Sequence, residues 1–180
     1  MEKLVAKTYA TALFDVAIES NQLDRFGEEL EFIVGTFRQH PEFYELYKTP
    51  QISSEEKKQI VAKVFQQGIS QEVMSFLKIL LDKRRTGSFE DIAKEYQRLA
   101  NAHNNIAEAV AITAIPMSSE EKLALENKLS MTTGKVVRLK NEIDDSIIGG
   151  ILVRIGDKVI DGTIQSRLNE LQESLAQIIV

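Results

Sequence analysis

Residues 143–164 read IDDSIIGGILVRIGDKVIDGTI, and this stretch carries the clearest strand pattern in the chain. Apolar side chains alternate over 151–155, as in a strand that is buried on one face. Gly156-Asp157 then fits the two positions of a tight hairpin turn, with glycine where a positive φ is needed. A second strand over 158–160 completes the pattern, and Asp161-Gly162 ends it. The stretch predicts a β-hairpin, so we expect the end of the chain to mix strands with helices.

The residues before this hairpin extend the mixed pattern. Residues 106–115 are rich in Ala, Val and Ile and predict a strand that ends at Pro116. Ser118 and Glu121 have capping-box spacing for a helix that runs to about Ser130 and is closed by Gly134. Residues 136–143 alternate again and predict a half-buried strand.

A final helix follows the hairpin. Its apolar residues are spaced by four and three, as in the narrow seam of a coiled coil: Ile164, Leu168, Leu171, Leu175 and Ile178. Two interpretations stay open at this point. The seam could dock on its own small sheet, or it could pair with a helix of another chain.

Residues 1–105 show helical periodicity throughout and contain every aromatic residue of the chain, eight Phe and four Tyr. The pattern predicts six helices: 4–20, one that Asn21 caps and that runs through Phe37, Pro41–Tyr47, one from Ser53 that ends at Gly68, Ser70–Arg85, closed by Gly87, and one from Ser88. The predicted fold class is α+β and predominantly helical. A six-helix bundle over 1–105 precedes a small mixed α/β domain over 106–180, with the boundary at His103-Asn104-Asn105.

The first and fifth of these helices are too apolar for ordinary surface helices. Their polar residues form only narrow stripes, such as Lys7, Thr11 and Asp15 in the first. They could be central helices enclosed by their neighbours. Alternatively, an exposed apolar groove between them could receive an amphipathic helix of a partner, with the small Ala6 and Ala10 allowing close approach.

Composition excludes several classes of function. The chain has no Cys, its two His are far apart, and its net charge is −5. Thiol chemistry and metal sites therefore lack ligands, and we expect no cofactor, metal or catalytic residue. A pI near 5.2 argues against nucleic-acid binding. Since no apolar run is long enough to cross a bilayer, we expect a soluble chain without a membrane span.

Short sequence motifs that could bind a nucleotide or catalyse a reaction do not match the known patterns either. Gly134-Lys135 lacks the Ser or Thr and the earlier glycine of a phosphate-binding loop, and Gly149-Gly150 is no dinucleotide fingerprint. Close backbone approach is enough to explain the glycine pair. Glu142 and Asp144 could share a face, but a solvated turn explains them better than an acid/base pair. The Lys83-Arg84-Arg85 run complements a helix end.

Residues 143–164, followed by Arg167-Leu168 and Leu171, closely resemble the C-terminal signature of the delta subunits of rotary ATP synthases. The mitochondrial member of this family is the oligomycin-sensitivity-conferring protein. Near the start, residues 9–17 (YATALFDVA) resemble the first helix of the family. Length and the order of helical and mixed parts agree, so the resemblance covers the whole chain.

The resemblance implies a non-catalytic peripheral-stalk subunit of the proton-translocating ATP synthase. In this family the bundle binds N-terminal segments of the alpha subunits of the catalytic head through its first and fifth helices. The C-terminal domain binds the b-type subunits of the peripheral stalk, so the head does not turn with the rotor. The implied location is the cytoplasmic face of the cell membrane, as a peripheral part of the complex.

Matched by position, the residues implied for binding the alpha subunits are Ala6, Tyr9, Ala10, Leu13, Phe14, Val73, Leu77 and Leu80. Those implied for the stalk are Leu168, Leu171 and Leu175. On this interpretation, Ala10→Asp abolishes head binding and leaves helicity intact. Two alternatives are a free-standing helical adaptor for amphipathic peptides and a hydrolase that uses Glu142 and Asp144.

Overall fold

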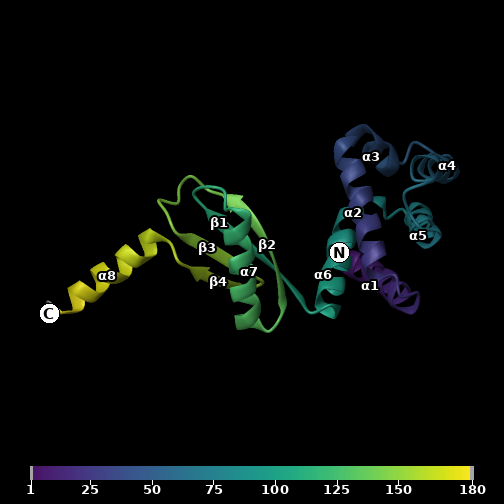
Figure 1. Cartoon of the computed structure of the whole chain (residues 1–180). Coiled ribbons are helices and arrows are strands. Elements are labelled where there is room, and N and C mark those ends of the chain that lie inside the picture. Colours follow the sequence, from purple (N-terminus) through teal and green to yellow (C-terminus); the bar gives the residue numbers. More distant parts are fainter. Residues whose placement is uncertain (1, 179–180) are drawn as a thin grey trace. The chain divides into compact units, whose positions relative to one another are not determined.

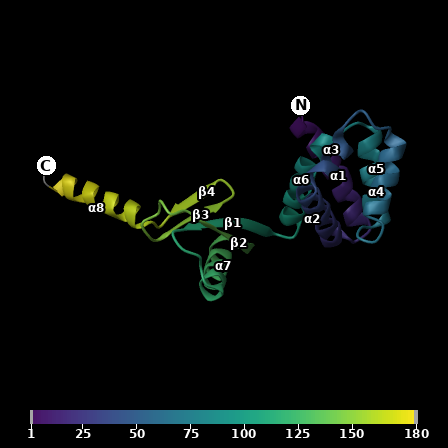
Figure 2. The same cartoon turned by 90° about the horizontal axis from the view of Figure 1, so that it is seen from above.

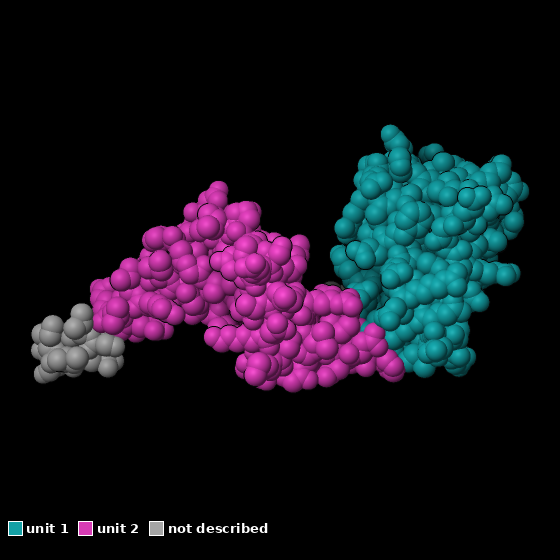
Figure 3. Space-filling view, in the orientation of Figure 1, with its two compact units in different colours: residues 1–100 teal, residues 101–180 magenta. Residues whose placement is uncertain are grey.

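The computed structural model describes the backbone of residues 2–178 and the side chains of residues 4–173. The chain divides into two compact units, residues 1–100 and 101–180 (Figure 3). The first is built from helices, and the second holds a four-stranded sheet. The predicted fold class, a helical bundle followed by a small α/β domain, is confirmed.

The first unit contains six α-helices and one short 3-10 helix among its described residues (Figure 1). Their bounds are α1 Glu2–Glu19, α2 Leu23–Gln39, α3 Pro41–Lys48, α4 Ser54–Val64, α5 Gln71–Asp82, η1 Thr86–Ser88 and α6 Phe89–His103. Helix α6 thus ends just before the boundary that the sequence predicts at 105, while the compact unit ends at residue 100.

Side-chain caps that the sequence predicts start α4 and α5. Ser53 and Glu56 form a complete capping box at α4, and the Ser70 hydroxyl accepts a hydrogen bond from the Val73 N–H at α5. Pro41 occupies the first turn of α3, where its missing N–H costs nothing. These starts follow from local chemistry alone.

Several predicted helix ends are wrong. Asn21 does not cap α2; with φ +54° it ends α1, and the next N–H, of Gln22, reaches Ala17 O at 2.8 Å. Arg84 does the same after α5 with φ +53°, so this helix ends at Asp82 rather than Arg85. In both cases a left-handed residue lets the chain bond back to the last turn.

Three further expected caps, at Gly68, Gly87 and Ser88, are also wrong. Helix α4 ends at Val64, before Gly68, whereas Gly87 and Ser88 belong to η1. A short 3-10 turn therefore replaces the glycine stop and serine cap expected between α5 and α6.

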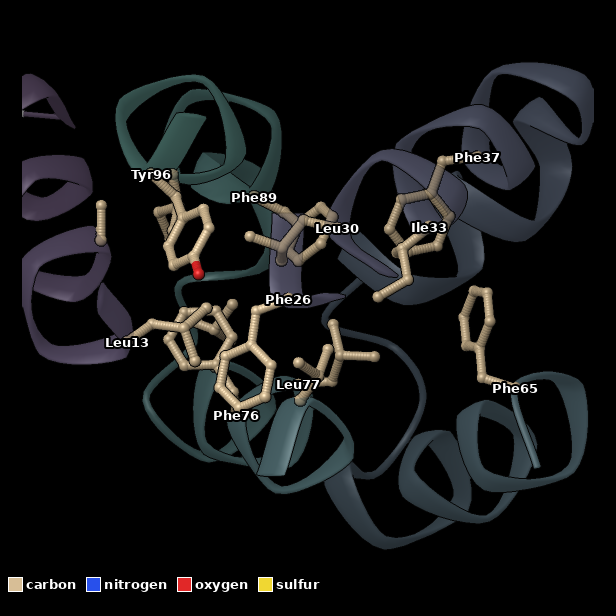
Figure 4. Packing of buried hydrophobic residues seen from close by; sticks show 14 of the residues in the cluster. Leu13, Phe26, Leu30, Ile33, Phe37, Phe65, Phe76, Leu77, Phe89 and Tyr96 are labelled. Carbon is tan, nitrogen blue, oxygen red and sulfur yellow. The ribbon is translucent and has the colours of Figure 1, made fainter. Parts of the chain in front are cut away.

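Aromatic side chains fill the core of the first unit (Figure 4). Phe37 of α2 has ring centroids 4.8 to 6.2 Å from five other rings: Phe43, Tyr44, Tyr47, Phe65 and Phe89. Tyr47 is fully buried, and its hydroxyl donates to the Leu77 carbonyl of α5 at 3.2 Å. Aromatic packing and one satisfied hydroxyl thereby join α2, α3 and α5.

The second unit is a sheet with strand order β2-β1-β3-β4. The strands are β1 Ile106–Thr113, β2 Val136–Ile143, β3 Ile151–Ile155 and β4 Lys158–Asp161. Strand β1 pairs in parallel with β2 and antiparallel with β3. The predicted hairpin is confirmed as β3 and β4, joined by Gly156 with φ +55° and Asp157.

Helix α7 (Ser119–Thr133) covers one face of the sheet (Figure 2). It has the predicted capping box at Ser118 and ends at Gly134 with φ +69°. Leu129 packs there on small and branched residues: Ala109, Ala111, Val137, Leu139 and Val153. This helix also protects the edge strand β2, because Ser130 Oγ and Glu126 Oε1 accept from the Val137 and Leu139 N–H groups.

Candidate partner-binding surfaces

Helices α1 and α5 meet through an aromatic pair. The rings of Tyr9 and Phe76 are in edge contact, with centroids 6.3 Å apart and planes at 67°. Phe76 is nearly buried, whereas Tyr9 is half-buried. The line along which the two helices meet therefore reaches the surface at Tyr9.

Apolar side chains flank this pair on both helices. Val5, Ala12 and Val16 lie three, four or seven positions from Tyr9, so helical periodicity places them on the same edge of α1. Val16 is 43% exposed, and Ile79, three residues after Phe76 on α5, is 47% exposed. We call these six residues the α1–α5 seam: Val5, Tyr9, Ala12, Val16, Phe76 and Ile79. None of these six residues is charged, and on α5 the same helical spacing leads to the charged residues Glu72 before them and Lys83 after them.

Polar contacts on the other sides of α5 hold it in place. Asp82 accepts from Lys58 Nζ at 2.7 Å and from the Ser54 hydroxyl at 3.0 Å, both on α4. The Lys58 ammonium lowers the pKa of the Asp82 carboxyl and keeps it charged. Together with the Tyr47–Leu77 hydrogen bond from α3, these contacts hold α5 against α3 and α4.

A hollow between α2 and the segment that precedes α5 has a polar lining. It is lined by Arg25, Glu28, Glu29, Phe32, Gln67, Gly68 and Ile69. The Glu29 carboxylate is already occupied, since it accepts from Arg25 Nε at 2.9 Å and from Ser70 N–H and Oγ. This carboxylate supports the structure by joining α2 to the start of α5.

Most of the head-binding residues implied by the sequence lie in the core of the bundle. Six of the eight are at most 3% exposed: Ala6, Ala10, Leu13, Val73, Leu77 and Leu80. Tyr9 lies on the α1–α5 seam. Phe14 lies on the opposite edge of α1, in edge contact with Tyr96 of α6 at 6.3 Å. Of the implied set, the structure brings only Tyr9 to the seam.

Five of the six seam residues are not among the residues that the sequence implied for head binding: Val5, Ala12, Val16, Phe76 and Ile79. Helix α1 is apolar around most of its circumference, so its pattern does not show which apolar edge faces the core. Ala10 is 0% exposed, so Ala10→Asp would bury a carboxylate without a partner, and we now expect this variant to destabilise the bundle rather than leave it intact.

Helix α8 (Ile164–Ile178) carries a second apolar surface. Leu168 and Leu171 are 53% and 61% exposed, and Ile164 is partly exposed as well. The interpretation in which these leucines dock on their own sheet is therefore wrong. The side chains of Leu175 and Ile178 lie outside the described residues. We call Ile164, Leu168 and Leu171 the α8 seam.

Acid/base or metal chemistry finds no support among the described residues. Asp144 accepts from the Ser146 N–H and hydroxyl, which lower the pKa of its carboxyl, and Glu142 pairs with Lys140 at 3.0 Å. The two carboxylates thus belong to a turn and a surface ion pair. Among the side chains that the structure describes, those of residues 4–173, no group of three His, Asp or Glu could hold a metal ion.

A family model described as ATP synthase delta (OSCP) subunit matches residues 5–175. The chain belongs to this family. The delta subunit of Alkaliphilus metalliredigens is 53% identical over 180 residues, the whole of both chains, and that of Clostridioides difficile is 41% identical over 99% of each. Family membership makes the chain a non-catalytic subunit of an ATP synthase and sets aside both the free-standing adaptor and the hydrolase.

Two solved structures resemble this delta-family chain. A chain of the Toxoplasma gondii mitochondrial ATP synthase hexamer shares the fold, with a TM-score of 0.73 and 20% identity over 95% of this chain and 97% of that one. A chain of the Polytomella F-ATP synthase, from a refinement focussed on the F1 head and rotor, matches with a TM-score of 0.51. It is 27% identical and covers 54% of this chain and 87% of that one. Within the described part of the chain, no helix is both long and apolar enough to span a bilayer.

Proposed function

We propose that this delta-family chain is the peripheral-stalk subunit that links the stalk to the alpha subunits of the catalytic head. The α1–α5 seam binds an N-terminal segment of an alpha subunit, and the α8 seam binds the b-type stalk subunits. The chain then works at the cytoplasmic face of the cell membrane as a peripheral part of the complex. The link prevents the head from turning with the rotor.

The observation that carries this proposal is the uncharged apolar edge of α1 beside Phe76 and Ile79. Val16 and Ile79 leave close to half of their surface in water, which favours covering them with apolar groups. A seam of this shape along two helices suits the apolar face of an amphipathic helix. Complete burial of one such side chain contributes about 1.5–3 kcal/mol, so a few contacts supply a useful affinity.

The match in the Polytomella F-ATP synthase supports attachment to the head. That structure is described as a focussed refinement of the F1 head and rotor. A relative present in a structure of the head is what the proposal expects of a subunit that binds the head.

The α8 seam supports attachment to the stalk. Its leucines are exposed and spaced as in a coiled coil, so a helix of another chain can complete the packing. The seams lie on two separate compact units. A chain with two such sites holds both partners more firmly than either site alone, because the second binding event becomes intramolecular.

The head contact is tested by isothermal titration of the full chain with a peptide of the N-terminal alpha-subunit segment from the same organism. We expect saturable one-to-one binding with a negative heat-capacity change, because apolar surface is buried. Ala12→Asp, on the seam, should weaken binding at least tenfold. Thr11→Asp, exposed on another side of α1, is the matched control. Equal affinities of the two variants would reject the seam as the binding site.

The stalk contact is tested with the soluble portion of the b-type subunit. Leu168→Asp should weaken its binding at least tenfold. Asn169→Asp adds the same charge one residue away, outside the seam, and it keeps the oxygen that accepts from Gln165. If Asn169→Asp and Leu168→Asp bind alike, the α8 seam is not the stalk contact.

A further inference from the structure

The loop before β3 lies directly against the start of α8. Gly150 has φ +86°, and a Cβ built on it would lie 2.4 Å from Gly162 O and 2.8 Å from Thr163 Cα. Both neighbours are backbone atoms that cannot rotate out of the way. Glycine is therefore required here for two independent reasons, the positive φ and the close approach.

Backbone hydrogen bonds also join the loop before β3 to the start of α8. The Ile164 N–H donates to Gly149 O at 3.0 Å, and the Gly162 N–H donates to Ile151 O at 2.9 Å. Asp161 accepts from the Thr163 N–H at 2.9 Å, and Thr163 Oγ1 accepts from the Ser166 N–H at 3.2 Å. The first turn of α8 is thus bonded both to the loop and to the end of β4.

Gly149 also lies close to the helix, but the nearest atom to a Cβ at this position belongs to a side chain rather than to the backbone. A Cβ built on it would lie 2.8 Å from Ile164 Cδ1, which is the far end of a flexible side chain. The glycine pair accordingly contacts α8 twice, once through backbone and once through the first side chain of the α8 seam.

We propose that Gly149-Gly150 is the seat that sets the direction in which α8 leaves the sheet, with Gly150 as the positioning residue. The proposal rests on the proposed function of α8 as the stalk contact. Leu168 and Leu171 are mostly exposed, so the direction of the helix is set where it begins. Since 15 residues of helix extend about 22 Å at 1.5 Å per residue, a rotation of about 20° at the base moves the tip by about 8 Å.

A distance measurement tests the seat. The chain has no Cys, so single cysteines placed at Met131 on α7 and Glu170 on α8 can carry spin labels at defined positions. Met131 is 87% exposed and Glu170 is also exposed, so neither replacement disturbs the core. Double electron–electron resonance then reports the distance from α8 to the helix that covers the sheet.

In the full chain, we expect Gly150→Ala to shift or broaden this distance distribution by several ångströms and to weaken binding of the soluble b-type segment at least tenfold. Binding of the alpha-subunit peptide should not change. Gly156→Ala is the matched control, because Gly156 also has a positive φ but a Cβ there meets nothing within 4 Å. A wild-type distance and affinity in Gly150→Ala would overturn the proposal.

A second variant covers the case in which Gly150→Ala does not fold. Gly149→Ala should produce a smaller shift in distance, and Ile164→Ala in the same chain should reverse it by removing the clashing atoms. A Gly149→Ala distribution identical to that of the wild type would count against the seat. If the wild-type chain does not bind the b-type segment, the stalk role of α8 fails, while the distance measurement still decides whether the seat orients the helix.

Discussion

Glu29 and Ser70 meet across 41 residues of sequence, with the Glu29 carboxylate accepting from the Ser70 N–H at 2.8 Å and from its hydroxyl at 2.6 Å. Both residues are buried. A carboxylate at the first turn of a helix also complements the helix dipole. The pair therefore fixes the start of α5, one of the two helices of the α1–α5 seam.

Removing this contact should destabilise the bundle. We expect Glu29→Ala to lower the free energy of unfolding by about 2–3 kcal/mol, because the buried donors of Ser70 lose their acceptor. Glu29→Gln should cost less, since its amide oxygen still accepts. Urea denaturation followed by circular dichroism measures both changes. Unchanged midpoints in Glu29→Ala would show that the contact adds nothing to stability.

Lys57 is a buried cation whose ammonium group donates hydrogen bonds to backbone carbonyls at the end of α3. Its Nζ donates to Tyr47 O at 3.0 Å and to Thr49 O. Burial lowers the pKa of Lys57 below its usual value. Lys57→Met should lower the free energy of unfolding by about 1–3 kcal/mol near neutral pH, because the two carbonyl groups lose their donor.

The same residue predicts a pH dependence. Since the pKa of Lys57 is lowered on folding, the unfolded chain binds more protons between the folded pKa and the usual value. Stability contributed by Lys57 must therefore rise with pH in that window. The difference in unfolding free energy between wild type and Lys57→Met should grow from pH 7 to pH 10. A difference that shrinks over this range would contradict the assignment.

The capping box of α7 predicts a dependence of the same sign in the acid range. Hydrogen bonds from the Ser118 N–H and hydroxyl lower the pKa of Glu121. The stability that this carboxylate contributes is present above its unfolded pKa and is lost as the pH falls through its folded pKa. Wild type should lose more stability than Glu121→Gln when the pH is lowered from 6 to 3, as chemical denaturation at each pH would show. Parallel losses would exclude the capping role.

The two faces of α1 should respond differently to the same substitution. Ala10→Asp buries a charge without a partner and should lower the free energy of unfolding by about 3 kcal/mol or more. Ala12→Asp places the charge on an exposed position and should stay within about 0.5 kcal/mol of wild type. Thermal unfolding separates the two outcomes. Equal stability would mean that the wrong edge of α1 has been assigned to the core.

Local chemistry made much of the fold predictable. The capping boxes at Ser53 and Ser118, the cap at Ser70 and the hairpin turn at Gly156 each depend on residues within a few positions. The predicted helix ends were wrong where a non-glycine residue adopts a left-handed conformation, as Asn21 and Arg84 do. The hydrogen bonds of the last turn favour that conformation; asparagine adopts it more readily than most residues, whereas arginine gives no sign of it.

The partner-binding surfaces were less predictable because they depend on packing between distant segments. Sequence pattern identified α1 and α5 as unusually apolar, but only the packed bundle separates Ala10 in the core from Ala12 on the seam. The Glu29–Ser70 contact was also out of reach, since nothing near Ser70 points to an acceptor 41 residues away. The role of Gly150 became visible only from its distance to Gly162.

The linking role is tested most directly by asking whether one chain holds both partners at once. The soluble b-type segment is immobilised, the full chain is added, and capture of isolated catalytic heads is measured. The proposal predicts that wild type captures heads, and that Ala12→Asp and Leu168→Asp each abolish capture while Thr11→Asp and Asn169→Asp retain it. Capture that persists in both seam variants, or that never occurs with the wild type, would contradict the proposed link between stalk and head.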